Sequence, residues 1–164
     1  MSTSWHSIFV LSESLGQTLN KKNLTLATAE SCTGGGIGFA ITQIPGSSQW
    51  YLGGINAYSN TVKRRLLGVS LSTMEYQGAV SQAVVAQMAL GVNERLSTQV
   101  SIATSGIAGP DGGSEEKPVG TVCFGWQILE GSHAETQVFA GDREAVRIQS
   151  IDCLLYTSPS PRDS

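Results

Sequence analysis

A short apolar segment that runs into a glycine-rich turn constrains the fold of this chain most. Residues 24–29 (LTLATA) alternate as a strand does, and Gly34–Gly36 follow closely. Residues 37–44 then have the pattern of a short helix that Pro45 and Gly46 end. A strand, a tight turn and a helix in this order expose the turn and aim its backbone N–H groups at one point. The segment therefore predicts an α/β protein with a functional turn.

Helical and strand patterns alternate through the first two thirds of the chain, and two strands follow each other later. This order predicts a mixed sheet covered by helices, rather than a purely parallel sheet. The predicted helices are an amphipathic one through Ile8, Leu11, Leu15 and Leu19, a basic turn at 61–67, the clearest helix at 81–96 with Ser81 as N-cap, and a last helix from Arg143 capped by Asp142. The other predicted strands are 50–59, 99–104, 119–129 and 135–139, with a turn at 130–132.

Composition and charge exclude several classes of protein. The 164 residues fit one domain, and the net charge of −3 argues against broad nucleic-acid binding, which needs a basic footprint. No apolar run is long enough for a membrane span, and no secretory signal is visible. The three cysteines do not suggest a disulfide framework or a zinc site, so we expect a cytoplasmic protein.

The end of the chain differs in composition from the rest. Residues 156–164 (YTSPSPRDS) are rich in Pro and Ser, which cannot continue a helix. A natural disordered tail is one interpretation. We favour the other, a foreign segment that cuts the last helix short. The expected organisation is a single domain over residues 1–155 and a disordered, non-native tail over residues 156–164.

Ser31 is the first candidate for chemistry, because it lies between the predicted strand and the glycine turn. A side chain in such a turn is exposed, as in a nucleophile elbow, although the G-x-S-x-G pattern is absent. The alternative is that Ser31 and Thr33 only cap a helix. Cys32 is a rival nucleophile, but a cysteine beside a strand end is usually a core residue.

A serine nucleophile needs a base, and the two histidines are poorly placed to serve. His6 lies in the first predicted helix and His133 in a predicted hairpin turn. Lys63, which follows Tyr58 near a strand end, can act as base if burial lowers its pKa toward neutrality. The alternative is that Lys63, with Arg64 and Arg65, forms a solvated basic face.

A second glycine-rich loop, Ser105–Gly113, also follows a predicted strand. Its glycines let the backbone approach a ligand and donate N–H groups to a phosphate or an oxyanion. A plain surface loop is the alternative. Arg143 and Arg147 share one face of the last helix and could clamp a phosphate, although most such pairs are only solvated. The acidic residues form no metal-ligand pattern, and we expect no metal; they are Glu30, Asp111, Glu115, Glu116 and Asp142.

Four segments, taken in order, resemble the CinA C-terminal domain family. They are AESCTGG (29–35), YSNTVK (58–63), SGIAGPDGGSEEKPVGTV (105–122) and GDREAVR (141–147). The resemblance runs from about Leu11 to Gln149. It implies a single domain with a three-layer α/β/α fold and a mixed, mostly parallel sheet.

The resemblance also implies an activity, because stand-alone members of the family are nicotinamide-nucleotide amidohydrolases. The expected reaction is hydrolysis of the carboxamide of nicotinamide mononucleotide to nicotinate mononucleotide and ammonia, in recycling of pyridine nucleotides (NAD). It needs neither cofactor nor metal, and relatives form homodimers. Ser31 matches the nucleophile and Lys63 the base, with Tyr58 close by. The residues expected to contact substrate are Cys32, Thr33, Gly34, Gly35, Ser48, Ser105, Gly106, Ala108, Gly109 and Arg147.

A second hypothesis is a nucleotide-binding, competence-associated module without catalysis. The distance between Ser31 Oγ and Lys63 Nζ separates the two hypotheses. A hydrogen bond favours the hydrolase, whereas a gap beyond about 6 Å favours the binding module. Hydrolysis of another pyridine-like or pterin-like substrate is a third option.

Overall fold

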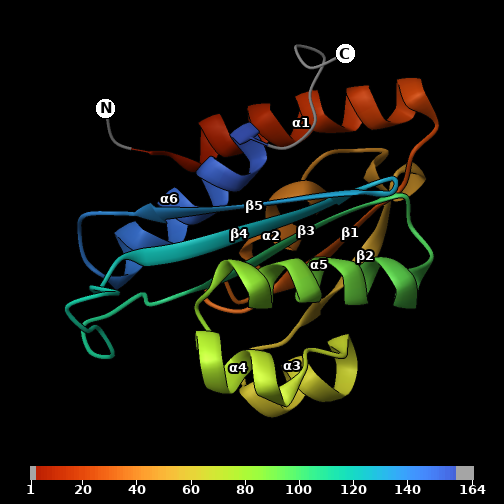
Figure 1. Ribbon diagram of the computed structural model, residues 1–164. Helices are drawn as coiled ribbons and strands as arrows, with labels where there is room; N and C mark the ends of the chain where they lie inside the picture. The colour runs from red at the N-terminus through yellow and green to blue at the C-terminus, as the bar shows by residue number, and fades with distance from the viewer. Residues whose placement is uncertain (1–2, 158–164) are drawn as a thin grey trace.

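The computed structural model describes residues 3–157 as a five-stranded sheet with helices on both faces (Figure 1). The strand order is β2-β1-β3-β4-β5. β1 pairs in parallel with β2 and β3, whereas β4 pairs antiparallel with β3 and β5. The mixed sheet is thereby confirmed. The strands are β1 (Leu26–Glu30), β2 (Tyr51–Asn56), β3 (Val100–Gly106), β4 (Thr121–Ile128) and β5 (Gly131–Val138).

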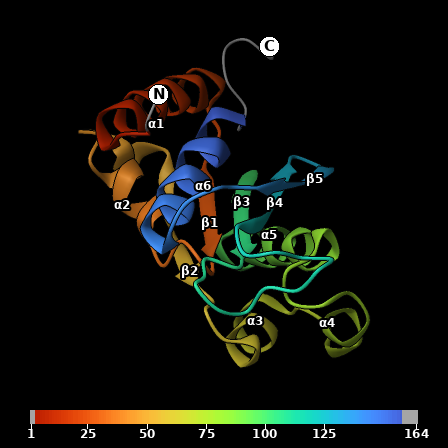
Figure 2. The same cartoon turned by 90° about the vertical axis from the view of Figure 1, so that its left-hand side faces the viewer.

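The helices form the two outer layers, which Figure 2 shows from the side. On one face lie α1 (Trp5–Lys22), α2 (Gly36–Thr42) and α6 (Arg143–Thr157), and a 3-10 turn, η1 (Ser47–Gln49), precedes β2. On the other face α5 (Gln82–Leu96) packs on the sheet, with α3 (Asn60–Leu67) and α4 (Leu71–Gln77) against it. The three-layer α/β/α fold is confirmed. None of the helices within residues 3–157 is both long and apolar enough to span a bilayer.

Alternation along the strands divides the core into two halves. On β4, Phe124 and Trp126 pack toward α1 and α6, whereas Cys123 belongs to the half beneath α5. Gly125 lets α5 approach the sheet, because a Cβ there would lie 2.5 Å from the Val85 carbonyl oxygen. α5 is therefore fixed against the centre of the sheet, and Ser81 caps it by accepting a hydrogen bond from the Val84 amide.

Three local expectations differ from the structure. α4 lies where we expected no element, although Ser70 caps it. β5 begins at Gly131 rather than Glu135. The sequence did not predict this earlier start, because the exposed polar residues of the strand show no apolar alternation. α6 is capped by Asp142 as expected, but it continues through Tyr156 and Thr157, which we assigned to the tail. The rest of that tail, 158–164, lies outside the described residues.

The turn between β1 and α2 is held by one buried carboxylate, that of Glu30. Its Oε1 accepts hydrogen bonds from Thr33 Oγ1 (2.7 Å) and the Ile37 amide (2.9 Å). Its Oε2 accepts one from the Gly38 amide at 3.0 Å. The side chain is 2% exposed, so these donors replace the water that a carboxylate otherwise binds. Glu30 therefore fixes the start of α2 relative to the end of β1.

We expect Glu30→Gln to destabilise the fold by about 2 kcal/mol, because an amide group replaces one charged acceptor among buried donors. Urea unfolding measures this loss. The control is Glu13→Gln on the exposed side of α1, which should change stability by less than about 0.5 kcal/mol. Equal losses in the two variants would contradict the structural role of Glu30.

Candidate active site

The carboxyl ends of three parallel strands meet at one edge of the sheet. The last residue of β1, Glu30, pairs with Asn56 of β2 and Thr104 of β3. The chain segments that follow these strands therefore emerge side by side. They carry Ser31, Tyr58 and the loop from Ser105, so the fold brings three of the four motif segments together.

The turn after β1 depends on small residues. Gly34 and Gly35 have φ values of +58° and +97°, which L side chains rarely adopt. Gly106 on β3 leaves room for the turn, because a Cβ there would lie 3.0 Å from Cys32 Sγ and 2.7 Å from Val122 Cγ2. The Ser31 amide donates to the Thr104 carbonyl at 3.1 Å, which ties the turn to β3. Ser31 is thereby held at the sheet edge.

Lys63 and Ser31 are in direct contact. Lys63 Nζ donates hydrogen bonds to Ser31 Oγ at 2.9 Å and to the Tyr58 carbonyl oxygen at 3.0 Å. Ser31 Oγ lies 3.4 Å from the same carbonyl oxygen. α3 delivers the lysine, and Ser59 caps that helix by accepting from the Val62 amide. The distance is that of a hydrogen-bonded dyad, which favours the hydrolase hypothesis over the binding module.

The environment of Lys63 disfavours its charged form. The side chain is 2% exposed, and burial lowers its pKa below the usual value for a lysine. No carboxylate within residues 3–157 forms an ion pair with it. A neutral amine beside a serine hydroxyl can accept the hydroxyl proton, which is what nucleophilic attack by serine requires.

A pocket of about 350 Å³ opens over this pair. Ser31 and Lys63 line it together with Arg143 from the first turn of α6. The predicted site residues that also line it are Tyr58, Cys32, Ser105, Gly106, Ala108 and Gly109. The structure thus brings the two glycine-rich segments and the dyad to one pocket of a size suited to a small ligand.

Tyr58 contributes to this site through its backbone rather than its ring. Its carbonyl oxygen accepts the hydrogen bond from Lys63, whereas its side chain is 64% exposed. The Tyr58 hydroxyl accepts a hydrogen bond from Arg143 Nη2 at 3.1 Å. The carbonyl group of Tyr58 therefore lies beside Ser31 and Lys63, as expected for this residue, whereas its hydroxyl group is bound to Arg143.

The remaining turn residues face a second pocket, on the other side of the turn. Arg147 Nε donates to the Cys32 carbonyl at 3.0 Å, and its Nη2 donates to the Thr33 carbonyl at 3.4 Å. This second pocket, of about 360 Å³, is lined by Trp5, Phe39, Ile148, Ile151 and Glu144 together with Thr33, Gly34, Gly35, Gly36 and Arg147. The structure does not bring these four predicted contacts, Thr33, Gly34, Gly35 and Arg147, into the pocket that holds Ser31.

Ser48 lines neither of these two pockets. It belongs to η1, which precedes β2, and its side chain is exposed. Because β1 and β2 are parallel, the start of β2 is at the opposite end of the sheet from Ser31. The six residues of β2 span roughly 20 Å. Within one chain, the structure does not bring Ser48, which we predicted to contact the substrate, close to Ser31 and Lys63.

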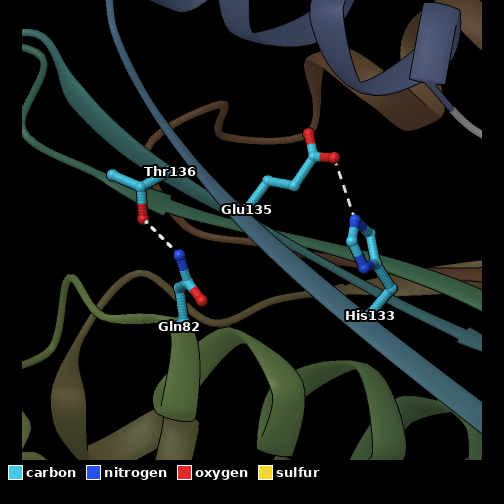
Figure 3. Close-up of polar contacts among 4 residues, drawn as sticks. All are labelled: Gln82, His133, Glu135 and Thr136. Carbon is cyan, nitrogen blue, oxygen red and sulfur yellow. Dashed lines mark hydrogen bonds and ion pairs between the residues drawn. The ribbon is translucent and has the colours of Figure 1, made fainter.

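The Cys32 thiol lines the pocket of Ser31 but ionises poorly, and neither histidine lines that pocket. Burial raises the pKa of the Cys32 thiol to about 12, so the thiolate is disfavoured. His133 lies on β5, not in a turn; its Nε2 is 2.9 Å from Glu135 Oε1, while Gln82 of α5 donates to Thr136 (Figure 3). His133 also stacks on Trp126. His6 lies on α1.

The sequence did not predict the contacts that Glu30 and Arg143 make at this site. Glu30 was considered only as a metal ligand, yet it organises the turn; its position at the end of the strand and three residues before Thr33 is the available signal. Arg143 was grouped with Arg147, and only the structure separates them. No group of metal-ligating side chains occurs within the described part of the chain.

The family is decided by the match of the CinA C-terminal domain to residues 9–157. The chain belongs to the CinA C-terminal domain family. Nicotinamide-nucleotide amidohydrolase PncC of Enterobacter agglomerans is 52% identical over 149 residues, which cover 90% of this chain and 91% of that protein. PncC of Escherichia coli K12 is 47% identical, with 90% of each chain covered.

Solved structures of CinA-related proteins have the same fold. The crystal structure of the competence/damage inducible protein CihA of Agrobacterium tumefaciens superposes with a TM-score of 0.89 at 35% identity. The match covers 95% of this chain and 94% of that one. These two PncC proteins and CihA are therefore each matched by this chain over nine tenths or more of their length.

We expect Cys32 of this CinA domain to resist alkylation by iodoacetamide at neutral pH, because its raised pKa leaves almost no thiolate. Mass spectrometry of the folded protein should find Cys32 unlabelled, and labelling after denaturation is the control. Rapid modification of Cys32 in the folded state would restore the cysteine as a candidate nucleophile.

Proposed function

We propose that this chain hydrolyses the carboxamide of nicotinamide mononucleotide to nicotinate mononucleotide and ammonia, with Ser31 as nucleophile and Lys63 as base. The observation that carries the proposal is the 2.9 Å contact between Lys63 Nζ and Ser31 Oγ inside a pocket. The name of the relatives, nicotinamide-nucleotide amidohydrolase, supports the reaction and the substrate class.

The reaction proceeds through an acyl-enzyme. Ser31 Oγ attacks the carboxamide carbon while neutral Lys63 takes the hydroxyl proton. The tetrahedral intermediate collapses, the C–N bond breaks, and the proton on Lys63 passes to the leaving nitrogen to give ammonia. Water then attacks the acyl carbon of the ester and gives a proton to Lys63. The bond between that carbon and Ser31 Oγ breaks, Ser31 Oγ takes the proton back from Lys63, and nicotinate mononucleotide leaves.

The backbone supplies the remaining contacts. The Tyr58 carbonyl accepts from Lys63 and orients the amine toward Ser31. We assign the oxyanion contact to the amide of Cys32, the residue directly after the nucleophile, which lines the same pocket. The Gly34 amide is not available for it, because it donates to the Ser31 carbonyl at 3.1 Å. The proposal thus narrows the oxyanion site from the whole turn to one residue.

The same proposal has a cellular part. The reaction returns a pyridine nucleotide in its acid form to NAD recycling, and we place it in the cytoplasm. We also propose that the chain works as a homodimer and binds a small nucleotide rather than nucleic acid, in keeping with the net charge of −3.

We expect Ser31→Ala and Lys63→Met to lower ammonia release from nicotinamide mononucleotide by at least about 10³-fold. Methionine keeps the volume of the buried lysine stem, which protects the fold. Ser132→Ala on β5 and Lys21→Ala on α1, both exposed, are the matched controls. Wild-type rates in Ser31→Ala would disprove the assignment of the nucleophile.

The lowered pKa of Lys63 predicts a pH dependence. The protonated amine cannot accept the Ser31 proton, so kcat/KM should rise with pH as Lys63 loses its proton. Because burial lowers this pKa, the midpoint of the rise should lie below the usual lysine value of about 10.4. Measurement of kcat/KM between about pH 6 and 10 gives the midpoint of this rise. If the residual activity of Lys63→Met rises with pH at the same midpoint, the rise belongs to the titration of another group.

A further inference from the structure

The second pocket lies on the other side of the Ser31 turn, and the proposed reaction does not use it. Its volume is about 360 Å³. Its lining comes from α1, α2 and α6, which contact one another on one face of the sheet (Figure 2), and from the glycines 34–36, which have no side chains to fill the space. A pocket of this size can hold a small molecule.

One part of this lining is aromatic and aliphatic. Trp5 of α1 and Phe39 of α2 meet edge to face, with their ring centroids 5.4 Å apart, and both side chains remain exposed. Phe9 stacks on Trp5 with a centroid distance of 5.9 Å. Ile148 and Ile151 of α6 add aliphatic surface. Exposed rings that gather around a pocket favour a flat, apolar ligand.

The other part of the lining carries one charge of each sign. Arg147 uses Nε and Nη2 to hold the Cys32 and Thr33 carbonyl oxygens, and its Nη1 has no hydrogen-bond partner within residues 3–157. Glu144, three residues earlier on α6, also lines the pocket. Among the described residues, neither of these two side chains forms an ion pair. The guanidinium can therefore receive one carboxylate, whereas Glu144 disfavours a second negative group.

We propose that the second pocket binds a small aromatic monocarboxylate, with its ring against Trp5 and Phe39 and its carboxylate on Arg147. The rings and the guanidinium together select this class over an aliphatic acid, which lacks the ring, and over an uncharged aromatic molecule. Glu144 selects against phosphates and dicarboxylates, because they carry more negative charge. The site therefore discriminates against the nucleotide that we propose as substrate.

Binding at the second pocket inhibits the reaction at Ser31, and this part of the inference rests on the proposed function. A carboxylate attracts the Arg147 guanidinium more strongly than the neutral carbonyl groups of Cys32 and Thr33 do. It therefore weakens the two hydrogen bonds through which Arg147, a positioning residue, holds the turn after Ser31. Because Arg147 does not line the pocket of Ser31, we expect kcat to fall while KM changes little.

Tryptophan fluorescence tests the binding directly, because Trp5 lines the second pocket and the other two tryptophans, Trp50 and Trp126, are buried in the core. Benzoate should change the emission saturably. Acetate, which lacks the ring, and benzyl alcohol, which lacks the charge, should each bind at least about 10-fold more weakly. Trp5→Phe keeps a ring, so it should abolish the signal while calorimetry still detects binding. If benzoate binds no more tightly than the other two compounds, the inference is overturned.

A second pair of ligands tests the selection by charge. Phthalate, which has two carboxylates, should bind to the wild type at least about 10-fold more weakly than benzoate. Glu144→Gln should remove most of this difference, whereas Glu13→Gln on the exposed side of α1 should leave it unchanged. Equal affinities of the wild type for the two acids would overturn the assignment to a monocarboxylate.

Kinetics tests the connection with Ser31. Benzoate should lower kcat for ammonia release from nicotinamide mononucleotide and change KM by less than about 2-fold. Phe39→Ala should raise the benzoate concentration for half inhibition of its own rate by at least about 10-fold, whereas Leu52→Ala, an equally exposed apolar residue outside the pocket, should not. A rise in KM at constant kcat would place benzoate in the pocket of Ser31 and overturn the inference.

The binding and the kinetic measurements fail independently. If the wild type releases no ammonia but benzoate still changes the Trp5 emission, the proposed hydrolysis fails and the second site stands. If ammonia is released and the Trp5 emission does not respond to benzoate, the hydrolysis stands and the second site is overturned.

Discussion

The site depends on the buried carboxylate of Glu30. A carboxylate that is removed from water must receive hydrogen bonds, and here the amides that begin α2 and the hydroxyl of Thr33 supply them. These bonds tie the turn between β1 and α2 to the first residues of α2. Thr33 Oγ1 also lies 2.9 Å from Thr104 Oγ1, which joins the turn to β3. The position of Ser31 follows from this arrangement, since Ser31 directly follows Glu30.

Burial of Lys63 links the stability of the fold to its chemistry. An ammonium group without a carboxylate partner is unfavourable in a buried site, and burial therefore lowers the pKa of Lys63. The neutral amine is the form that can accept a proton from Ser31. The serine hydroxyl and the Tyr58 carbonyl are its hydrogen-bond partners, and neither carries a charge. The packing that lowers the pKa would therefore also prepare Lys63 for the proposed role as base.

The sequence predicted the elements that carry strong local patterns. The strand before Ser31, the glycine turn and the Ser81-capped helix follow from periodicity and capping, which are local properties. α4 and the first half of β5 were missed, because a short helix and an exposed polar strand have little apolar periodicity. The pairing of Ser31 with Lys63 was expected from the family resemblance and not from their spacing, and the backbone contact of Tyr58 was not expected. Side-chain patterns do not show which carbonyl a lysine reaches.

Arg143 and Arg147 show what sequence spacing leaves open. Residues four apart share a face of a helix, so the sequence suggested that both arginines could clamp one phosphate, although most such pairs are only solvated. The start of α6, however, lies where the Ser31 turn separates two pockets. One helical turn is enough to place the first guanidinium at the Gly109 carbonyl and the second at the Cys32 carbonyl. α6 thus contacts both the loop after β3 and the turn after Ser31. The position of this one helix therefore determines where the Arg143 guanidinium lies in the pocket and how the turn is held by Arg147.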